Sequence, residues 1–297
     1  MRIIKKIGNR LKIIIKRILF HVYYGLKDII TGKKVIVNYW IAPKADPEFY
    51  NIGDDLNLVL VKFISGKSVI PYRYAMMSRF KKRVNYLCIG SIISQLSNEQ
   101  AVVWGSGVLS PDLPLTRKPL QVLAVRGPLT REYLLKNGVD CPEVYGDPAL
   151  LLPNYYLPAT FGKKYKVGII PHYRDKGNKI LDAYKQEEDV YIFDVQRYGS
   201  YNLFIDAICA CDLIVSSSLH GLIISDAYGV PNVWAEFSGD KIEQFKFEDY
   251  FLSVQRTSDN LPLKMDSFKP VHELLRFRED WQAPRLELDK LIQSCPF

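Results

Sequence analysis

Apolar residues recur along the chain with two spacings, and each spacing predicts one kind of element. Short apolar runs rich in β-branched residues predict strands. These runs lie at residues 35–40, 86–89, 102–104, 122–125, 143–145, 167–170, 190–193, 213–216 and 232–235. Segments with apolar residues three or four positions apart predict helices. These segments lie at residues 56–64, 128–136, 179–186, 201–211, 221–228, 271–278 and 286–293. Strands that alternate with helices indicate parallel sheets, so we expect an α/β fold.

A segment without a clear period, residues 153–166, separates two such alternating regions. It is rich in Pro, Tyr and Lys, a composition typical of a connection between domains. A chain of 297 residues also exceeds what one hydrophobic core ordinarily fills. We therefore predict two Rossmann-like domains, residues 35–155 and 156–297, that face each other across a cleft. The second domain carries the terminal helices.

The first 34 residues form a separate unit in the pattern. Apolar residues recur there every three or four positions, at Ile4, Ile7, Leu11, Ile14, Ile18 and Val22. Lysines and arginines occupy the other faces. This spacing predicts a basic amphipathic helix over residues 1–34. Lys16 and Arg17 interrupt the apolar residues, so the segment lacks the continuous run of a membrane-spanning helix or a signal peptide.

The net charge of +8 is concentrated in this helix. Residues 1–34 hold ten of the 40 Lys and Arg residues and one acid, Asp28, whereas the rest of the chain holds 30 basic and 31 acidic residues. A basic helix with an apolar stripe is typical of binding to an anionic membrane surface, here through residues 1–30. Nucleic-acid binding is disfavoured, because the body has no basic excess. The alternative is a helix docked on the body with its charges in water.

The five cysteines indicate neither a disulfide framework nor a metal site. Cys209 and Cys211 lie in an apolar run with no His at ligand spacing, which favours a place in the core. We therefore predict reduced thiols and no bound metal.

In open α/β sheets, ligands bind beyond the carboxyl ends of the strands, and six loops at such positions carry glycine or polar residues. The first, residues 51–54, contains Asn51, Gly53 and Asp54. Its glycine turn and helix start either hold an anion or only cap the helix. The second contains Gly105 and Ser106, small residues that let the backbone approach a ligand or simply leave the strand in a turn.

The next two loops carry a charged residue directly after a strand. Pro128 suits the first turn of a helix, so Arg126 is expected at the strand end, pointing into the cleft. Asp147 follows Gly146 and either caps the next turn or orients a sugar hydroxyl.

The last two loops lie in the second domain. One places His172 and Arg174 after a strand, and the other, residues 216–221, places a serine cluster and His220 where a strand gives way to a helix. The serines and the helix N-terminus can form an anion pocket, and His220 stands where it can exchange a proton.

Six ordered motifs resemble those of the polysaccharide pyruvyltransferase family. They are NxGD at 51–54, GSGV at 105–108, VRGPLT at 125–130, GDPA at 146–149, GIIPHYRD at 168–175 and SSSLHGLIISDAYGVP at 216–231. The resemblance covers residues 45–235 and is closest to the branch that adds ketal pyruvate to exopolysaccharide repeat units. It implies a GT-B-like fold with residues 35–155 on the acceptor side and residues 156–297 on the donor side. It also implies phosphoenolpyruvate as donor, a lipid-linked oligosaccharide as acceptor, and no cofactor.

The resemblance implies a role for each strand-end residue. His220 is the candidate acid, with Asp54, Asp147 or His172 as base. His172 is also a candidate for holding the anionic groups of the donor. Candidate phosphoenolpyruvate-binding residues are Arg126, Arg174, Ser217, Ser218, Leu219 and Gly221. Candidate acceptor-binding residues are Asn51, Gly53, Asp54, Gly105, Ser106 and Asp147. Many relatives have an Arg at the position of Ser218. In this chain, binding of the anionic donor is therefore expected to depend more on Arg174 or on backbone N–H groups.

Two other functions fit the same sequence. A GT-B glycosyltransferase that uses a nucleotide sugar would need a similar fold and similar strand-end glycines. A non-catalytic subunit of a polysaccharide assembly complex would fit the missing Arg. For a pyruvyltransferase with this N-terminal helix, the expected location is the cytoplasmic face of the membrane.

Overall fold

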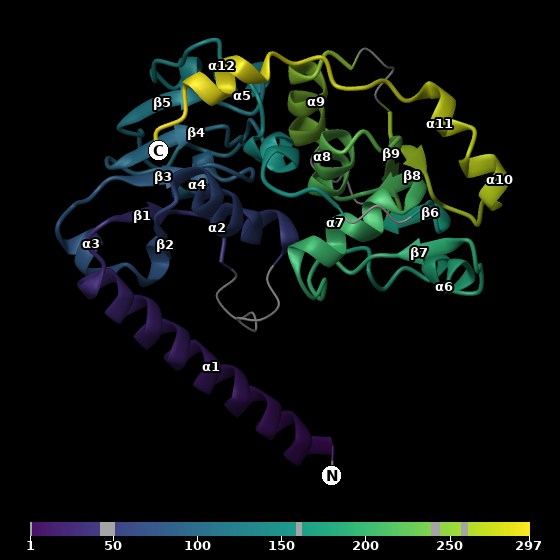
Figure 1. The fold of residues 1–297 in the computed structure, drawn as a ribbon, viewed down its shortest axis with the longest axis horizontal. Helices are drawn as coiled ribbons and strands as arrows, with labels where there is room; N and C mark the ends of the chain where they lie inside the picture. Colours follow the sequence, from purple (N-terminus) through teal and green to yellow (C-terminus); the bar gives the residue numbers. More distant parts are fainter. Residues whose placement is uncertain (1, 42–50, 159–161, 239–243, 257–260) are drawn as a thin grey trace.

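A computed structural model describes residues 2–41, 51–158, 162–238, 244–256 and 261–297 (Figure 1). It contains two parallel sheets of five strands each, with helices on their faces. The predicted parallel α/β architecture is therefore confirmed. The first sheet lies in the N-terminal half of the chain and the second in the C-terminal half.

The N-terminal sheet has the strand order β2-β1-β3-β4-β5. Its strands are β1 (Lys34–Val37), β2 (Ser68–Pro71), β3 (Asn85–Leu87), β4 (Ala101–Trp104) and β5 (Gln121–Ala124). Its helices are α2 (Ile52–Ser65), α3 (Met76–Phe80), α4 (Ile93–Leu96) and α5 (Pro128–Lys136), with short 3₁₀ turns η1 (Tyr72–Tyr74) and η2 (Pro148–Asn154). Asn51 caps α2, where its side chain accepts a hydrogen bond from the backbone N–H of Gly53.

The C-terminal sheet has the order β10-β9-β8-β6-β7. Its strands are β6 (Tyr165–Ile170), β7 (Val190–Ile192), β8 (Cys211–Ser216), β9 (Asn232–Glu236) and β10 (Leu263–Lys264). Its helices are α6 (Ile180–Tyr184), α7 (Tyr201–Cys209), α8 (Leu219–Ala227), α9 (Gln244–Ser253), α10 (Val271–Leu274) and α11 (Phe277–Asp280). The chain ends with α12 (Leu288–Gln293).

The two sheets share one topology. Counted within each half, both have the order 2-1-3-4-5, so the order reverses between β1 and β3 in one sheet and between β6 and β8 in the other. Ligands of doubly wound folds bind beyond the carboxyl ends of the strands at such a reversal. The topology therefore directs attention to the loops after these four strands.

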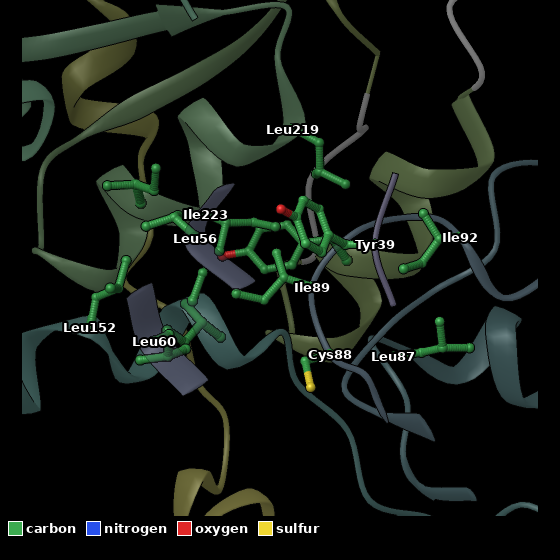
Figure 2. Packing of buried hydrophobic residues seen from close by; sticks show 14 of the residues in the cluster. Tyr39, Leu56, Leu60, Leu87, Cys88, Ile89, Ile92, Leu152, Leu219 and Ile223 are labelled. Atoms are coloured by element: carbon green, nitrogen blue, oxygen red, sulfur yellow. The ribbon is translucent and has the colours of Figure 1, made fainter. Parts of the chain in front are cut away.

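One apolar cluster joins the two halves. Figure 2 shows Leu219 and Ile223 of α8 in the same cluster as Leu56 and Leu60 of α2, and all four side chains are buried. A buried ion pair adds a polar link, because Asp249 of α9 accepts hydrogen bonds from the Arg126 side chain and from the backbone of Thr130 in α5. The halves are thus held together by packing as well as by charge.

The end of the chain crosses back to the N-terminal half, where α12 lies over β4 and β5 (Figure 1). The indole N–H of Trp104 in β4 donates to the backbone oxygen of Leu291, 3.0 Å away. The ring of Phe297 packs edge-on against Trp104 and against Tyr86. The C-terminal segment is therefore part of the core of the other half.

Helix α1 (Arg2–Ile30) projects away from both sheets (Figure 1). Its C-terminal part is fixed to the body, where Tyr24 stacks on Tyr74, and buried Asp28 accepts hydrogen bonds from Ser78 and pairs with Lys34 at 2.9 Å. Its large apolar side chains stay exposed, at Leu11, Ile14, Ile15, Ile18, Leu19, Val22, Tyr23, Leu26, Ile29 and Ile30.

Several elements differ from the prediction. The strand predicted at 143–145 is a single bridge between Tyr145 and Val125. Strands β2 and β10 and helix α9 were not predicted, because β2 ends in a proline, β10 has two residues, and the aromatic residues of α9 follow no clear period. Helix α2 begins at Ile52, four residues before the predicted start, because Asn51 is its cap.

Candidate active site

The loops after β1, β3, β6 and β8 line a common pocket with a volume of about 260 Å³. Trp40 follows β1, Ser91 follows β3, His172 follows β6 and His220 follows β8. Asn51 and Asp54 of the α2 N-terminus complete one wall, and Lys246 of α9 completes the other. The residues come from both halves of the chain and meet at both reversals of strand order.

His220 lies in the first turn of α8 and packs directly against α2. A Cβ atom on Gly53 would stand 2.1 Å from Nδ1 of this imidazole, so only glycine leaves room for the ring. The other ring nitrogen, Nε2, is buried 3.8 Å from a carboxylate oxygen of Asp147. Within the described structure, neither Nε2 of His220 nor this carboxylate oxygen of Asp147 has a hydrogen-bond partner. Nε2 thus faces Asp147 in the interior, whereas Nδ1 faces the N-terminal turn of α2.

Burial shifts both members of this pair toward their neutral forms. Removal from water, together with the positive charges of Arg126 and Lys246, lowers the pKa of His220 to about 3. Removal from water raises the pKa of Asp147 to about 7, although the Ala149 N–H and Arg126 oppose this shift. Near neutral pH, the Asp147 carboxyl group of this pair therefore binds or releases a proton, while the imidazole of His220 stays uncharged.

The raised pKa of Asp147 predicts a pH-dependent cost to stability. Because the folded-state pKa of about 7 exceeds the ordinary value of 3.8, the native state binds more protons, and the free energy of unfolding falls as the pH rises between these values. We expect Asp147→Asn to raise the free energy of unfolding by up to about 4 kcal/mol at pH 8 and to change it little at pH 4.

Urea unfolding at the two pH values checks this expectation. Asn retains an oxygen that can accept the Ala149 N–H bond, which Asp147 accepts at 2.9 Å. The exposed residue Asp140 supplies the matched control, Asp140→Asn. An equal effect of Asp147→Asn at both pH values would contradict the assignment.

Two of the predicted base candidates, Asp54 and His172, face the pocket. Burial, reinforced by neighbouring Asp55, raises the pKa of Asp54 well above its usual range, although the positive charge of Lys246 opposes the shift. Burial also lowers the pKa of His172 to about 3, with Lys246 and Arg174 contributing. Arg174 lies exposed at the pocket, its guanidinium 5.8 Å from the centre of the Tyr173 ring.

The α8 N-terminus contributes Ser218 and Leu219 to the pocket lining. Ser218 occupies the cap position, but its side chain makes no capping hydrogen bond. The backbone N–H groups of the first turn of a helix have no partner inside that helix, so they are available to an anion. Gly221 does not line the pocket: a Cβ there would meet the Ser216 hydroxyl at 2.4 Å, so the glycine serves close packing of α8 on β8.

A sequence profile of the family described as polysaccharide pyruvyl transferase matches residues 18–236, most of the chain. The chain belongs to the polysaccharide pyruvyl transferase family. The resemblance inferred from the motifs is confirmed, and with it the prediction that the protein is a transferase of this kind.

Two relatives of this pyruvyl transferase were found by sequence comparison. An uncharacterized protein of Acanthamoeba polyphaga mimivirus is 29% identical over 227 residues, which cover 75% of this chain and 75% of that protein. The succinoglycan biosynthesis protein ExoV of Rhizobium meliloti (strain 1021) is 29% identical over 221 residues, which cover 71% of this chain and 62% of ExoV.

Arg126 of the pyruvyl transferase does not point into the pocket as predicted. Its side chain is fully buried, pairs with Asp249 at 2.9 Å, and donates to the Val108 backbone oxygen and to the Ser91 hydroxyl. All the nitrogens of its guanidinium are therefore engaged by protein atoms. Because Ser91 lines the pocket, Arg126 acts on the site by holding Ser91 and α9 in place.

Three other predicted site residues also have packing roles. Gly105 adopts a positive φ of 88° against Pro148, and the Ser106 hydroxyl donates to the backbone oxygen of Gly90. Ser217 is fully buried and donates to Asp175. None of the three lines the pocket, so the structure does not support their assignment to acceptor or phosphoenolpyruvate binding.

Lys246 is the pocket cation that the sequence analysis missed. It is 8% exposed, lines the pocket, and influences the pKa values of Asp54, His172 and His220. It lies beyond the region that matches the family profile, on a helix that the apolar pattern did not reveal. Ser91 was also missed, although it follows a strand and a glycine, as Ser106 does.

A larger cavity of about 800 Å³ lies in the C-terminal half, between β7 and α7. Its described lining is rich in aromatic residues and includes none of the predicted site residues. We place the candidate active site in the smaller pocket. Asp54, His172 and His220 line this pocket, and the loops at both reversals of strand order meet there. Within the described residues, no three His, Cys, Asp or Glu side chains gather as a metal site requires. None of the described helices is both long enough and apolar enough to cross a membrane.

Proposed function

We propose that this pyruvyl transferase moves a pyruvyl group from phosphoenolpyruvate onto two hydroxyls of one saccharide, forming a cyclic ketal and releasing phosphate. The observation that carries the proposal is the meeting of His220, the α8 N-terminus and Lys246 in one pocket. A proton donor beside two kinds of anion-binding group matches a donor substrate that is an anionic enol ester.

The donor carries a carboxylate and a phosphate, and the pocket offers partners for both. Lys246 and Arg174 supply positive charge, and the first turn of α8 supplies backbone N–H groups. Partial burial strengthens the attraction of Lys246, whereas solvent screens that of exposed Arg174. We therefore assign the main binding role to Lys246 and α8, with Ser218 in place of the Arg found in many relatives.

The first chemical step adds a proton to the methylene carbon of the donor. In the proposal, Nδ1 of His220 gives up its proton while Nε2 receives the proton of Asp147, so the ring stays neutral overall. The pKa of about 7 for Asp147 supports this route, and the transfer itself requires Nε2 and the carboxyl group to close their 3.8 Å separation to hydrogen-bond distance. The saccharide hydroxyl then bonds to the carbon that bears the phosphate.

Asp54 or His172 accepts the proton of this hydroxyl, since both line the pocket. A second hydroxyl of the same sugar then displaces phosphate from that carbon, which closes the ketal ring. The bonds formed are two C–O bonds, one C–H bond and one bond from the remaining hydroxyl proton to phosphate or to the base. The bonds broken are the π bond of the enol ester, the phosphate C–O bond and two hydroxyl O–H bonds.

A ligand comparison distinguishes this reaction from nucleotide-sugar transfer. Phosphoenolpyruvate should raise the midpoint of thermal unfolding, whereas a panel of nucleoside diphosphates should not. A phosphate-release assay with phosphoenolpyruvate and a panel of lipid-linked saccharides then tests turnover. Protection by a nucleoside diphosphate alone would favour the glycosyltransferase function, and neither protection nor turnover would favour a non-catalytic subunit.

Lys246→Gln is expected to weaken phosphoenolpyruvate binding by about tenfold or more, because it removes a charge-assisted contact. Isothermal titration with phosphoenolpyruvate measures the effect. Lys264→Gln is the matched control, since Lys264 is exposed on β10 and pairs with Glu236 away from the pocket. Equal affinity in the two variants would refute the role of Lys246.

We also propose that α1 holds the enzyme on an anionic membrane surface. Its exposed apolar side chains and the basic residues Lys12, Lys16 and Arg17 lie on a helix that projects from the body. An apolar stripe inserts at the lipid interface while basic side chains contact anionic headgroups. A lipid-linked acceptor would then be held at the same surface.

Reversing the three charges, Lys12→Glu, Lys16→Glu and Arg17→Glu together, should weaken binding to phosphatidylglycerol vesicles by at least about 100-fold, at about 1 kcal/mol per basic residue. Vesicle sedimentation measures this loss. The matched control reverses Lys81, Lys82 and Arg83, which are exposed on the body. Activity on a lipid-linked acceptor should fall while activity on a soluble acceptor persists; equal loss on both acceptors would contradict the membrane role.

A further inference from the structure

A second cavity adjoins the active-site pocket on the side of the N-terminal half. Its volume is about 470 Å³, and two of its lining residues, Trp40 and Gln95, also line the active-site pocket. The cavity extends from these residues across η1 and α3 to the loop that carries Arg117. A ligand that passes Trp40 would therefore occupy both cavities. We call the second cavity the arginine groove.

Three arginines give this groove its charge: Arg73, Arg79 and Arg117. No acidic residue is among the described residues that line it. Arg73 donates one hydrogen bond to the Ile41 backbone oxygen, and the Arg79 guanidinium lies 5.2 Å from the centre of the Tyr72 ring. In the part of the chain that the structure describes, no acidic side chain pairs with any of the three.

A neutral polar group in the groove also lacks a partner. Ser97 is 3% exposed and lines the groove, and within the described structure its hydroxyl makes no hydrogen bond. A buried hydroxyl without a partner costs free energy that a ligand oxygen can recover. The groove thus combines three guanidinium groups with an unused hydroxyl donor.

This chemistry fits a diphosphate next to a sugar. Guanidinium groups bind phosphate oxygens in a bidentate manner, and several of them suit a ligand with more than one negative charge. Trp40 is 43% exposed at the junction of the two cavities, where its ring offers a flat face to a sugar. A saccharide whose far end reaches the active-site pocket would therefore place its linking group among the arginines.

The position of α1 fits a lipid beyond that diphosphate. Tyr24 of α1 stacks on Tyr74 of η1, next in sequence to Arg73, so the groove lies beside the point where α1 joins the body. We propose that the arginine groove binds the diphosphate ester that links a saccharide acceptor to its lipid. This inference rests on the proposed function in one respect, namely that the acceptor is a saccharide.

The test measures binding, so that it does not depend on turnover. The probes are a saccharide carrying a diphosphate ester of a short alkyl alcohol, the same saccharide as a simple alkyl glycoside, inorganic pyrophosphate, and phosphatidylglycerol vesicles. The test variant carries Arg79→Gln and Arg117→Gln and keeps Arg73 because of its bond to Ile41. The control is Arg83→Gln, an exposed arginine that does not line the groove.

The saccharide diphosphate should bind wild type and the control equally and the double variant about 100-fold more weakly, at about tenfold per arginine. The alkyl glycoside should bind all three proteins alike. Equal affinity of wild type for the diphosphate and the glycoside would overturn the proposal. The proposal would also be overturned if the arginine substitutions weakened only the binding of vesicles, or only the binding of pyrophosphate. The site would then hold a lipid headgroup or a free anion.

Phosphoenolpyruvate binding is measured on the same proteins and answers a separate question. The double variant should bind it as wild type does, which also shows that the variant is folded. If wild type bound the saccharide diphosphate through the arginines but did not bind phosphoenolpyruvate, the donor would be wrong and the groove assignment would stand.

Discussion

His220→Ala should reduce phosphate release from phosphoenolpyruvate by about 100- to 10,000-fold while the protein stays folded. The loss follows from removal of the proposed proton donor. The fold should survive, because in the described structure Nε2 of His220 makes no hydrogen bond that the substitution would break. Turnover is measured under saturating donor and acceptor, and circular dichroism and thermal unfolding report on the fold.

The matched control is His272→Ala, because His272 is an exposed histidine on α10, outside the pocket. It should leave turnover unchanged. A His220→Ala enzyme that retains more than about a tenth of wild-type turnover would rule out general acid catalysis by this ring.

Gly53→Ala should lower turnover by about 100-fold and should also cost about 1–3 kcal/mol of stability, because the new methyl group overpacks a buried contact. The new Cβ would stand 2.1 Å from Nδ1 of His220, so the imidazole has to move out of line with its substrate. A displacement near 1 Å is enough for a loss of this size. The helix itself gains, since Ala is more favourable than Gly in a helix by about 1 kcal/mol.

Gly25→Ala is the matched control, because Gly25 lies in α1 and a Cβ there would meet nothing within 4 Å. Gly25→Ala should maintain or raise the midpoint of thermal unfolding and leave turnover unchanged, whereas Gly53→Ala should lower both. Full activity of Gly53→Ala would show that the ring position does not matter for the reaction, and would count against His220 as the acid.

The convergence of the strand-end loops could be predicted from sequence for a physical reason. Parallel strands place their carboxyl ends at one edge of each sheet, and the two domains were expected to face each other across a cleft, so Asp54, His172 and His220 were expected near one another. The same reasoning identified Arg174 and Ser218, both of which line the pocket. What the residues do there remains a prediction.

The direction in which a strand-end side chain points was beyond the sequence. Arg126 follows β5 as expected, but its partner Asp249 lies 123 positions later, on a helix that no periodic pattern revealed. Lys246 was missed for the same reason, since it belongs to that helix. A buried ion pair and a buried pocket lysine look like ordinary surface charges until the tertiary contacts are known.

Contacts between motifs were also hidden. The sequence identified Gly53 as a turn residue and His220 as a proton donor. It did not show that the two residues are in contact, nor that the lack of a side chain on Gly53 leaves room for the imidazole. The sequence allowed two roles for Asp147, as a helix cap or as a ligand of a sugar hydroxyl. In the structure one carboxylate oxygen of Asp147 caps η2, and the other oxygen lies beside His220. Each motif was visible alone, whereas the three-dimensional pairing of motifs was not.

The crossing of α12 back to the first sheet has a consequence for biosynthesis. A ribosome makes Trp104 long before Leu291 and Phe297, so these residues can cover the indole of Trp104 only after most of the second half has been made. The half that is made first therefore completes its hydrophobic interior with residues of the half that is made second.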